Sequence, residues 1–267
     1  MGAENRYYES EGIVVRKMRL GEAARILTVL TPGAGKVSAV AKGVCRPKSK
    51  MSGHLELFTH SQIEFARGHN LDTIINCQTI HSFHKIKEDL MSAAYATYFC
   101  ELADGFSEHD IECRKLFSLL VECLSQLNED MAGADTVRTY FEMQCLIAGG
   151  YRPQTRTCVK CNEKIKEEMN FFSMDNGGIM CPQCAQFESR SFPISVAAIK
   201  VLRVLSEENL KTCLRLKLKP ELIGELNAIL GKYISFILEK PLKTPSWIAK
   251  VKAVSIINTT SFTIAKI

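Results

Sequence analysis

Four cysteines in two tight pairs are the residues of this sequence with the clearest chemistry. Two residues separate Cys158 from Cys161 and Cys181 from Cys184, and nineteen residues lie between the pairs. This C-x₂-C-x₁₉-C-x₂-C spacing is typical of a four-cysteine zinc site, because each short turn presents two thiolates to one cation. Four sulfur ligands complete a tetrahedron and leave no position for water. The spacing therefore predicts one structural Zn²⁺ per chain, with two buried or redox-active dithiols as the alternative.

The other cysteines and the composition indicate a globular protein of a reducing compartment. The total of 11 cysteines is odd, seven of them are scattered singly, and the N-terminus lacks the apolar core of a secretory signal. Of 267 residues, 46% are hydrophobic and 24% charged, near the averages for globular chains. No window approaches the ~18 uncharged apolar residues of a membrane-spanning helix. We expect a cytoplasmic protein without disulfides, built from one large domain or two ordinary ones.

Charge is divided unevenly along the chain, whose net charge is +5. Residues 1–80 carry 11 basic and 7 acidic side chains, residues 81–157 carry 7 and 12, and residues 158–267 carry 16 and 10. The first and last segments are therefore basic and the middle one is acidic. This distribution favours contact with polyanions on two of the three segments, with an ordinary solvated surface as the alternative.

The first 80 residues have the pattern of a small β-barrel. Short β-branched runs alternate with turns at Gly21, Pro32-Gly33 and Gly68, which predicts strands and not helices. Strands are expected at residues 12–18, 24–30, 36–42, 58–65 and 72–80. Five short strands in so few residues favour a closed or nearly closed barrel. The connector between the third and fourth strands is basic and is expected at the barrel rim, where loops usually carry function.

From residue 84 onward the hydrophobic period becomes that of helices. Helices are expected at residues 90–102, 116–127, 137–147, 196–205 and 220–239, with Ser195 as the cap of the fourth. Asn176-Gly177-Gly178 suits the tip of a hairpin that joins the two cysteine pairs. The predicted divisions are a barrel at 1–82, a helical domain in two parts at 83–156 and 189–245, a zinc module at 157–188, and an unassigned tail without clear period at 246–267.

One stretch similar to a phosphate-binding loop is interpreted as a hairpin turn. Gly33-Ala34-Gly35-Lys36 lacks the first glycine and the final hydroxyl of the full motif, because Leu30 and Val37 occupy those positions. The stretch also lies between two expected strands and not between a strand and a helix. No nucleophile elbow, zinc-protease motif or nucleotide fingerprint is present. The sequence therefore gives no reason to expect an enzyme.

Several stretches, taken in order, resemble the RecO family of bacterial DNA repair and recombination proteins. YESEGIVVR at 8–16 and GEAARILT at 21–28 are similar to the family's first hairpin. KV at 36–37 and AKGVCRPKS at 41–49 resemble its third strand and basic loop, and LIAGGYRP at 146–153 resembles the junction before its zinc module. The resemblance covers about residues 6–240. It implies an α+β multidomain fold, with an N-terminal five-stranded OB-fold barrel and an all-α domain that carries an inserted four-cysteine zinc module.

The resemblance implies a non-enzymatic, nucleoid-associated mediator of DNA repair and homologous recombination, which binds single- and double-stranded DNA and anneals complementary strands. The implied partners are RecR, the C-terminal tail of the single-stranded-DNA-binding protein and, indirectly, RecA, which the family helps to load onto covered DNA. Eight barrel cations are expected to contact phosphates and release counterions: Arg16, Lys17, Arg19, Arg25, Lys42, Arg46, Lys48 and Lys50. The alternatives are a zinc-ribbon adaptor acting in transcription or on RNA, and a zinc-dependent enzyme.

A second basic stretch, in the C-terminal part of the helical domain, is a candidate for binding the partner's tail. It contains Lys211, Arg215, Lys217 and Lys219, which interleave with leucines at 210, 214, 216 and 218. Lys211 and Arg215 would share a helix face if the segment were helical. Such a surface suits an acidic peptide with a hydrophobic end, as the resemblance implies for this tail. The alternative is a solvated helix face whose leucines belong to the core.

Overall fold

The computed structural model describes residues 6–264, with side chains described as far as residue 254. The chain divides into two compact units, residues 1–131 with 243–267 and residues 132–242. The domain limits predicted from the sequence divide the chain more finely and stay predictions. Among the described residues, no helix has the length and apolar character needed to cross a membrane.

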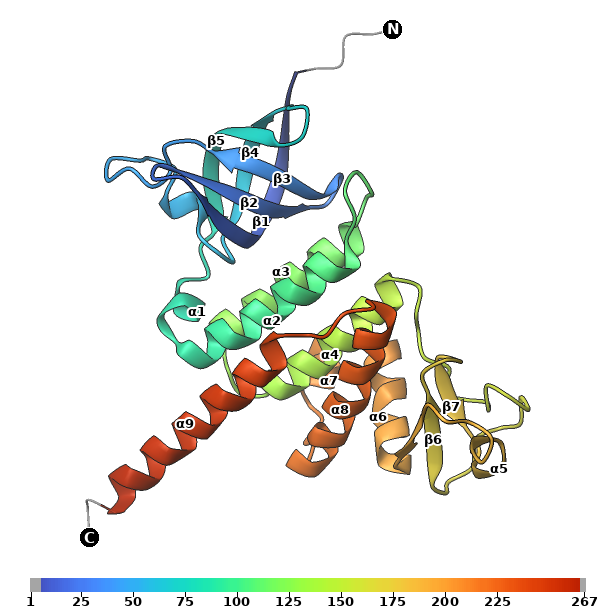
Figure 1. The fold of residues 1–267 in the computed structure, drawn as a ribbon. Helices are drawn as coiled ribbons and strands as arrows, with labels where there is room; N and C mark the ends of the chain where they lie inside the picture. The colour runs from blue at the N-terminus through green and yellow to red at the C-terminus, as the bar shows by residue number, and fades with distance from the viewer. Residues whose placement is uncertain (1–5, 265–267) are drawn as a thin grey trace, which may run out of the picture. The chain divides into compact units, whose positions relative to one another are not determined.

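Five strands close into a barrel in the first unit (blue to cyan in Figure 1). They are β1 (Tyr7–Leu20), β2 (Ala24–Thr31), β3 (Gly35–Ala41), β4 (His60–Ala66) and β5 (Asp72–His81). Their order is β1-β2-β3-β5-β4, and β4 also pairs with β1. All pairs are antiparallel except the short β3–β5 pair. The five predicted strands and the predicted OB-like barrel are thus confirmed.

The barrel interior is built by residues that alternate along the strands. In β3 every second residue from Gly35 to Ala41 is buried, the period of a strand with one face in a core. The interior contains Val14, Leu27, Val29, Val37, Ala39, Ala41, Ile63, Phe65 and Ile74. Val44 and Leu55, from the connector between β3 and β4, are buried against the same cluster. The basic connector is therefore anchored to the barrel core at two points.

Three helices follow the barrel in the first unit: α1 (His84–Glu88), α2 (Leu90–Phe106) and α3 (Arg114–Glu129). Asp89 caps α2 by accepting a hydrogen bond from the N–H of Ser92. The loop between α2 and α3 is tied to the β2–β3 turn, because the N–H of Lys36 donates to the carbonyl of Glu108 at 3.0 Å. The helices expected at 90–102 and 116–127 are confirmed, with longer ends.

The segment that shows no clear hydrophobic period contains a helix, α9 (Thr244–Ile264), in red in Figure 1. Glu101 of α2 fixes its start by accepting hydrogen bonds from the N–H groups of Lys243 and Thr244, at 2.8 and 3.0 Å. The helix packs against α2. Thr244, Ile248 and Val251 are buried along the part of α9 whose side chains are described, but the apolar residues of the full α9 sequence do not follow a helical period. Its sequence therefore lacks the period by which an amphipathic helix is found.

The second unit combines helices with a small sheet. Its elements are α4 (Ala134–Ala148), β6 (Asn170–Ser173), β7 (Gly178–Met180), α5 (Pro182–Ala185), β8 (Ser191–Ile194), α6 (Val196–Glu207), α7 (Leu210–Cys213) and α8 (Pro220–Ile237). The expected helices at 137–147, 196–205 and 220–239 are confirmed, and the Ser195 hydroxyl accepts from the N–H of Ala198 as a cap. The sheet order is β7-β6-β8. Phe172 of β6 contacts Tyr233 of α8 edge to face, with ring centroids 5.1 Å apart.

Candidate metal centre and nucleic-acid interface

The four paired cysteines meet at one point of the second unit. Cys158 and Cys161 lie in a turn before β6, Cys181 directly precedes α5, and Cys184 lies within α5. All four sulfur atoms lie within 4.8 Å of one another, and those of Cys161 and Cys181 are 3.9 Å apart. A tetrahedral zinc ion with Zn–S bonds of about 2.3 Å separates its sulfur ligands by about 3.8 Å. The cluster therefore has the size that such an ion requires.

The closeness of the cysteines also perturbs the pKa values of some of their thiols. Burial raises the pKa of the Cys158 thiol, but the backbone N–H groups of Cys161, Cys181 and Lys160 outweigh it and bring the pKa to about 6. The pKa of Cys184 is raised, first by its hydrogen bond with the neighbouring Cys181 thiol. Four sulfurs this close cannot all carry a negative charge unless a cation neutralises them. A metal bound here would join the two turns and, with four protein ligands, leave no position for a substrate.

The β6–β7 hairpin brings the two cysteine pairs together, as expected from the sequence. Gly177, at its tip, has φ 62°, in the region that favours glycine. The N–H of Val159 donates to the carbonyl of Ile179 at 2.9 Å and so ties the first cysteine turn to β7. Around the cysteines, Met180 and Ala185 join Cys158 in the buried cluster, and Val159, Ile165 and Phe171 pack against it partly buried. The cysteine module therefore has very little apolar core of its own.

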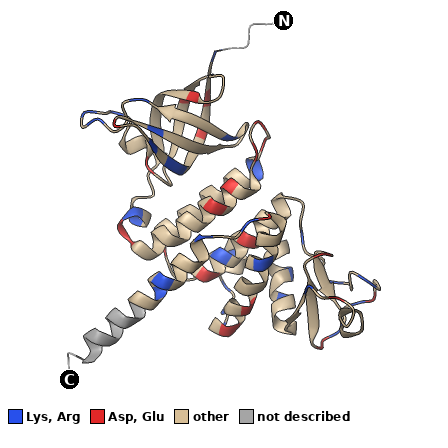
Figure 2. Cartoon of the chain, viewed as in Figure 1, with Lys and Arg blue, Asp and Glu red and all other residues tan. Residues whose placement is uncertain are grey.

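Four of the eight cations expected to contact DNA belong to the connector between β3 and β4. They are Lys42, Arg46, Lys48 and Lys50, and all four are exposed. The N–H of Cys45 donates to the carbonyl of Ala23 at 3.2 Å, so the connector begins beside the β1–β2 turn. Figure 2 shows Lys and Arg gathered in the loops at the left edge of the barrel. This edge presents exposed cations on surface loops, an arrangement that suits a nucleic-acid backbone.

The other four cations lie on the β1–β2 ribbon and are divided between its two faces. Lys17 pairs with Leu27, a residue of the barrel interior, and Arg19 pairs with Arg25. Because side chains of directly paired residues point to the same face, Lys17, Arg19 and Arg25 share the inner face. Arg16 lies on the outer face, with Met18 two residues along the strand, whose side chain is exposed. The structure therefore does not place the eight cations on one continuous surface.

An acidic residue that the sequence reasoning missed lies among these cations. Glu56, at the end of the connector, binds Lys17 and Arg25, with O–N distances of 2.5 and 3.0 Å. Burial raises the pKa of Glu56, but hydrogen bonds from Lys17 and Arg25 outweigh it, so the pKa is lowered. Lys87 of α1 is also close, and its Nζ donates to the Thr59 hydroxyl at 2.7 Å. No local signal could reveal this group, because Glu56 is 39 residues from Lys17 and 31 from Arg25.

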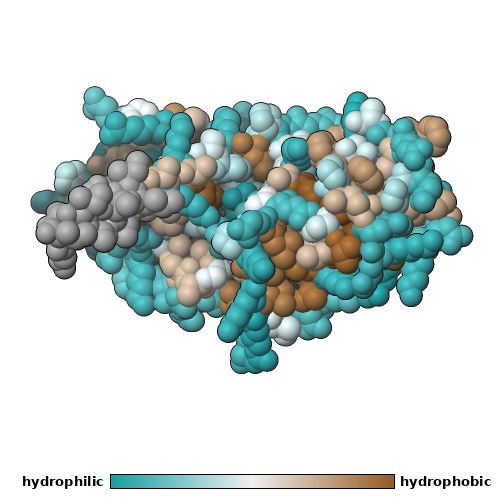
Figure 3. Space-filling view, turned by 90° about the horizontal axis from the view of Figure 1, so that it is seen from below, coloured by the Kyte–Doolittle hydropathy of each residue, from teal (hydrophilic) through white to brown (hydrophobic). Residues whose placement is uncertain are grey.

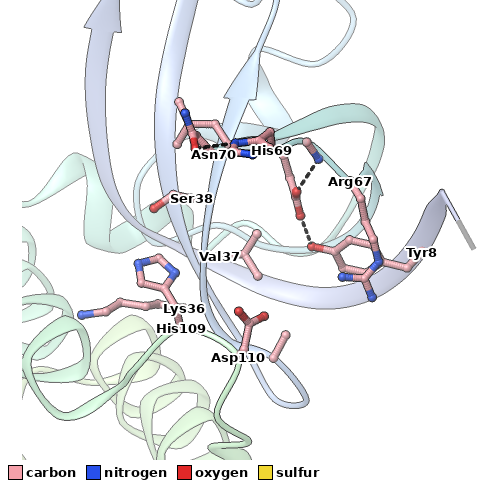
Figure 4. Close-up of a pocket in the computed structure, with 13 residues that line it drawn as sticks. Tyr8, Lys36, Val37, Ser38, Arg67, His69, Asn70, His109 and Asp110 are labelled. Atoms are coloured by element: carbon pink, nitrogen blue, oxygen red, sulfur yellow. Dashed lines mark hydrogen bonds between the residues drawn. The ribbon is translucent and has the colours of Figure 1, made fainter. Parts of the chain in front are cut away.

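A polar cavity of about 600 Å³ lies beside β3 and the β4–β5 loop (Figure 4). The Tyr8 hydroxyl donates to Asp72 at 2.5 Å, and the Arg67 guanidinium lies 4.8 Å from the centre of the Tyr8 ring. The lining includes Lys36 and Arg67 but also Asp72 and Asp110. Lys36 Nζ donates to the main-chain carbonyl of Asp104 at 2.8 Å, outside the cavity lining. The cavity lining thus has no surplus of cations. The Gly-Ala-Gly-Lys stretch forms a turn between two strands and does not form a phosphate-binding loop.

The condition under which Lys211 and Arg215 would share a helix face is not met, because the helix does not extend to Arg215. Helix α7 ends at Cys213, and residues 216–219 are not helical. Exposed Arg215, Lys217 and Lys219 instead alternate with half-buried leucines, in a strand-like period. Figure 3 shows apolar surface among hydrophilic side chains on the face seen from below. The four predicted tail-binding cations are thus all exposed, with Lys211 on α7 and the other three on the irregular segment that follows it.

Comparison with known proteins agrees with this architecture. Residues 6–83 match the family described as Recombination protein O N terminal, and residues 87–246 match Recombination protein O C terminal. A protein of Dehalococcoides mccartyi strain 195 named DNA repair protein RecO is 41% identical over 241 residues, which are 90% of this chain and 94% of that protein. A protein of the same name from Roseiflexus sp. is 35% identical, over 93% of this chain and 87% of that protein. The chain therefore belongs to the RecO family of DNA repair proteins.

Proposed function

We propose that this protein is a non-catalytic mediator of homologous recombination. It binds single- and double-stranded DNA, anneals complementary strands and, together with RecR, helps to load RecA onto DNA covered by the single-stranded-DNA-binding protein. The observation that carries the proposal is the exposed basic connector, anchored at Val44 and Leu55 on a closed five-stranded barrel, in a chain of the RecO family. Phosphate contacts of this kind are independent of sequence, as annealing of arbitrary strands requires.

The connector is tested by the salt dependence of DNA binding. Changing Lys42, Arg46 and Lys48 together to Ala should weaken binding to all single-stranded oligonucleotides alike. It should also reduce the slope of log affinity against log salt by about 2, at roughly 0.7 per phosphate contact. Fluorescence anisotropy of a labelled oligonucleotide at several salt concentrations measures both quantities.

A matched control removes three cations from elsewhere in the chain. Lys211, Lys217 and Lys219 are exposed and lie in the second unit, and their change to Ala gives the same net charge. This control should leave the slope of DNA binding unchanged. If both triple variants reduce the slope equally, the connector is not the contact surface.

A separate assay distinguishes a mediator from an enzyme. Complementary strands should anneal without any nucleotide cofactor, and the annealing rate should stay the same when DNA is added in repeated cycles.

The same control variant tests the proposed partner segment. Arg215, Lys217 and Lys219 would attract the acidic tail of the single-stranded-DNA-binding protein, while Leu216 and Leu218 would contact its hydrophobic end. A labelled tail peptide should therefore bind the Lys211/Lys217/Lys219 variant more weakly than the wild type, while the Lys42/Arg46/Lys48 variant should bind it normally. Equal peptide affinities for all three proteins would move the site to another part of the helical region.

We further propose that the cysteine cluster holds one structural Zn²⁺ per chain. Four thiolates suit a soft or borderline cation, and zinc is the common occupant of closed Cys₄ sites. Metal analysis of the purified protein should give one zinc per chain.

A further inference from the structure

Glu56 occupies a position where an anion bridges two cations of the proposed DNA-binding barrel. Its two carboxylate oxygens bind different partners, since Oε2 accepts from Lys17 of β1 and Oε1 accepts from Arg25 of β2. All three side chains are reached by solvent, with exposed fractions of 32% for Lys17, 24% for Arg25 and 36% for Glu56. A phosphate oxygen in place of the carboxylate would find the same two donors. The group therefore has the chemistry of a phosphate site that an internal carboxylate already fills.

The backbone around Glu56 is fixed, so only its side chain is free to leave. Leu55, the preceding residue, is fully buried in the barrel core. On the other side, the N–H of Phe58 donates to the carbonyl of Val14 at 3.0 Å, and the N–H of Thr59 donates to the carbonyl of Glu56 at 3.2 Å. Rotation of the Glu56 side chain about its own bonds would vacate the site without any change in the fold.

Lys17 and Arg25 stay in place when Glu56 leaves, because the strands hold them. The two residues lie on the same face of the β1–β2 ladder, where Lys17 pairs with Leu27 and Arg19 pairs with Arg25. Lys87, held by the Thr59 hydroxyl, adds a third positive charge nearby. Three cations and one carboxylate leave a local surplus of positive charge, which attracts a phosphate before Glu56 is displaced.

We propose that Lys17 and Arg25 form a backbone-phosphate site of the barrel, and that Glu56 occupies this site until DNA displaces it. The inference rests on the proposed DNA-binding function and adds a residue that opposes it. A DNA phosphate and the Glu56 carboxylate compete for the same two cations, so Glu56 lowers affinity in the free protein and its removal raises affinity. Glu56 thereby sets how readily this part of the barrel binds and releases a strand.

The test is a comparison of two charge-neutralising variants. Glu56→Gln should bind a labelled single-stranded oligonucleotide roughly 2- to 30-fold more tightly than wild type, the range that corresponds to freeing two exposed ion pairs. Glu64→Gln changes the net charge equally, but Glu64 lies on β4 opposite Glu9 of β1 and away from these cations. It should therefore change affinity much less. Thermal unfolding of both variants checks that the barrel is intact.

The same two glutamate changes, made in a protein that lacks both cations, distinguish the release of Lys17 and Arg25 from a general effect of charge. In a Lys17→Gln/Arg25→Gln protein, DNA binding should be weaker than in wild type, and adding Glu56→Gln should gain no more than adding Glu64→Gln. Equal gains for the two glutamate variants in the wild-type background would overturn the proposal, and so would weaker binding by Glu56→Gln, which would mean that Glu56 orients the cations for DNA. If the wild type binds no DNA at all, the proposed function itself fails, and the inference fails with it.

Discussion

Loss of one of the four clustered cysteines is expected to release the proposed zinc ion and unfold the cysteine module locally. We consider Cys181→Ser, because Cys181 joins the β7 strand to α5 and its N–H donates to the Cys158 sulfur at 3.4 Å. Zinc should fall from one per chain to nearly none. The helices of the second unit should remain folded, because Phe172 and Ile179 of the β6–β7 hairpin are buried independently of the cysteines.

The size of the effect follows from how little apolar surface the module buries. Beside Cys158, its cluster contains the buried Met180 and Ala185 and the partly buried Val159, Ile165 and Phe171, whose burial together contributes about 3–5 kcal/mol. Ordering the two cysteine turns, at 157–166 and 181–188, costs about 1 kcal/mol for each of about 18 residues. Backbone hydrogen bonds recover a few kcal/mol of this cost. The remaining deficit of about 10–15 kcal/mol is comparable with the ~10–16 kcal/mol that structural zinc contributes in small modules.

Hydrogen exchange with peptide resolution measures this prediction directly. In Cys181→Ser, amides of the two cysteine turns should exchange at rates close to those of an unfolded chain, while amides of α4, α6 and α8 keep their protection. Cys45→Ser is the matched control, because Cys45 is a half-buried cysteine of the barrel connector. It should keep both zinc and protection. Full zinc content together with unchanged exchange in Cys181→Ser would refute the reasoning, since the turns would then be held by something other than the metal.

Two further predictions concern the barrel and the hairpin. Burial lowers the pKa of His60, whose Nδ1 has no hydrogen-bond partner within the described part of the chain. As the pH falls, His60 therefore takes up a proton in the unfolded state before it does so in the folded state. The contribution of His60 to the free energy of unfolding should be fully present above about pH 6.5. Below that pH, the free energy of unfolding should fall by up to about 1.4 kcal/mol per pH unit. Urea unfolding between pH 5 and 7.5 should show this slope in wild type and lose it in His60→Gln, and parallel curves would contradict it. In the hairpin, Gly177→Ala should destabilise by about 1–3 kcal/mol, because φ is 62° and the new Cβ would lie 2.7 Å from the Tyr233 hydroxyl. Gly33→Ala, with no atom within 4 Å of the new Cβ, should be nearly neutral, and equal melting temperatures for the two variants would count against the explanation.

Local patterns in the sequence were enough to predict most of the barrel and the metal cluster. Strand β3 has a regular alternation from Gly35 to Ala41, and turn-forming residues mark both of its ends. The cysteine pairs have fixed spacing, and the Asn-Gly-Gly stretch between them marks the hairpin tip. In each case the signal lies within a few residues along the chain. In such cases the spacing of the residues along the chain is enough to indicate the geometry of the element.

The elements that were missed have local patterns that conflict with their final structure. Strand β8 contains Pro193, which argues against a strand, yet β8 lies at the edge of its sheet, where proline is tolerated. The sequence of α9 has no helical hydrophobic period over its full length, although Ile248 and Val251 are buried. The hydrogen bonds from the N–H groups of Lys243 and Thr244 to Glu101, which fix the start of α9, cross more than 140 residues. The helical condition for Lys211 and Arg215 is not met, because α7 ends at Cys213. In residues 214–219 leucines alternate with cations in the period of extended backbone, and Pro220 favours extended backbone at Lys219 directly before it.

The division of the barrel cations could not be predicted because it depends on strand register. Arg16 and Lys17 are neighbours in sequence, but the period of two along a strand places them on opposite faces. The β-bulge between Val14 and Arg16 decides which of them faces the interior. A count of basic residues treats these side chains as one set. Only the paired strands show that Glu56 can bind Lys17 and Arg25 together and that it cannot bind Arg16 in the same way.

An internal carboxylate on the proposed DNA-binding surface is consistent with the proposed annealing activity, for which the tightest binding is not the best. A protein that anneals strands must hold two of them, let them pair and then leave the duplex. Cations that return to Glu56 when a phosphate departs are not left unpaired, so Glu56 offsets part of the cost of release. The exposed connector cations, Lys42, Arg46, Lys48 and Lys50, have none of the ion pairs found among the described residues and would remain available for capture. On this reasoning, the connector governs how strands are captured, and the group of Lys17, Arg25 and Glu56 governs how easily they are released.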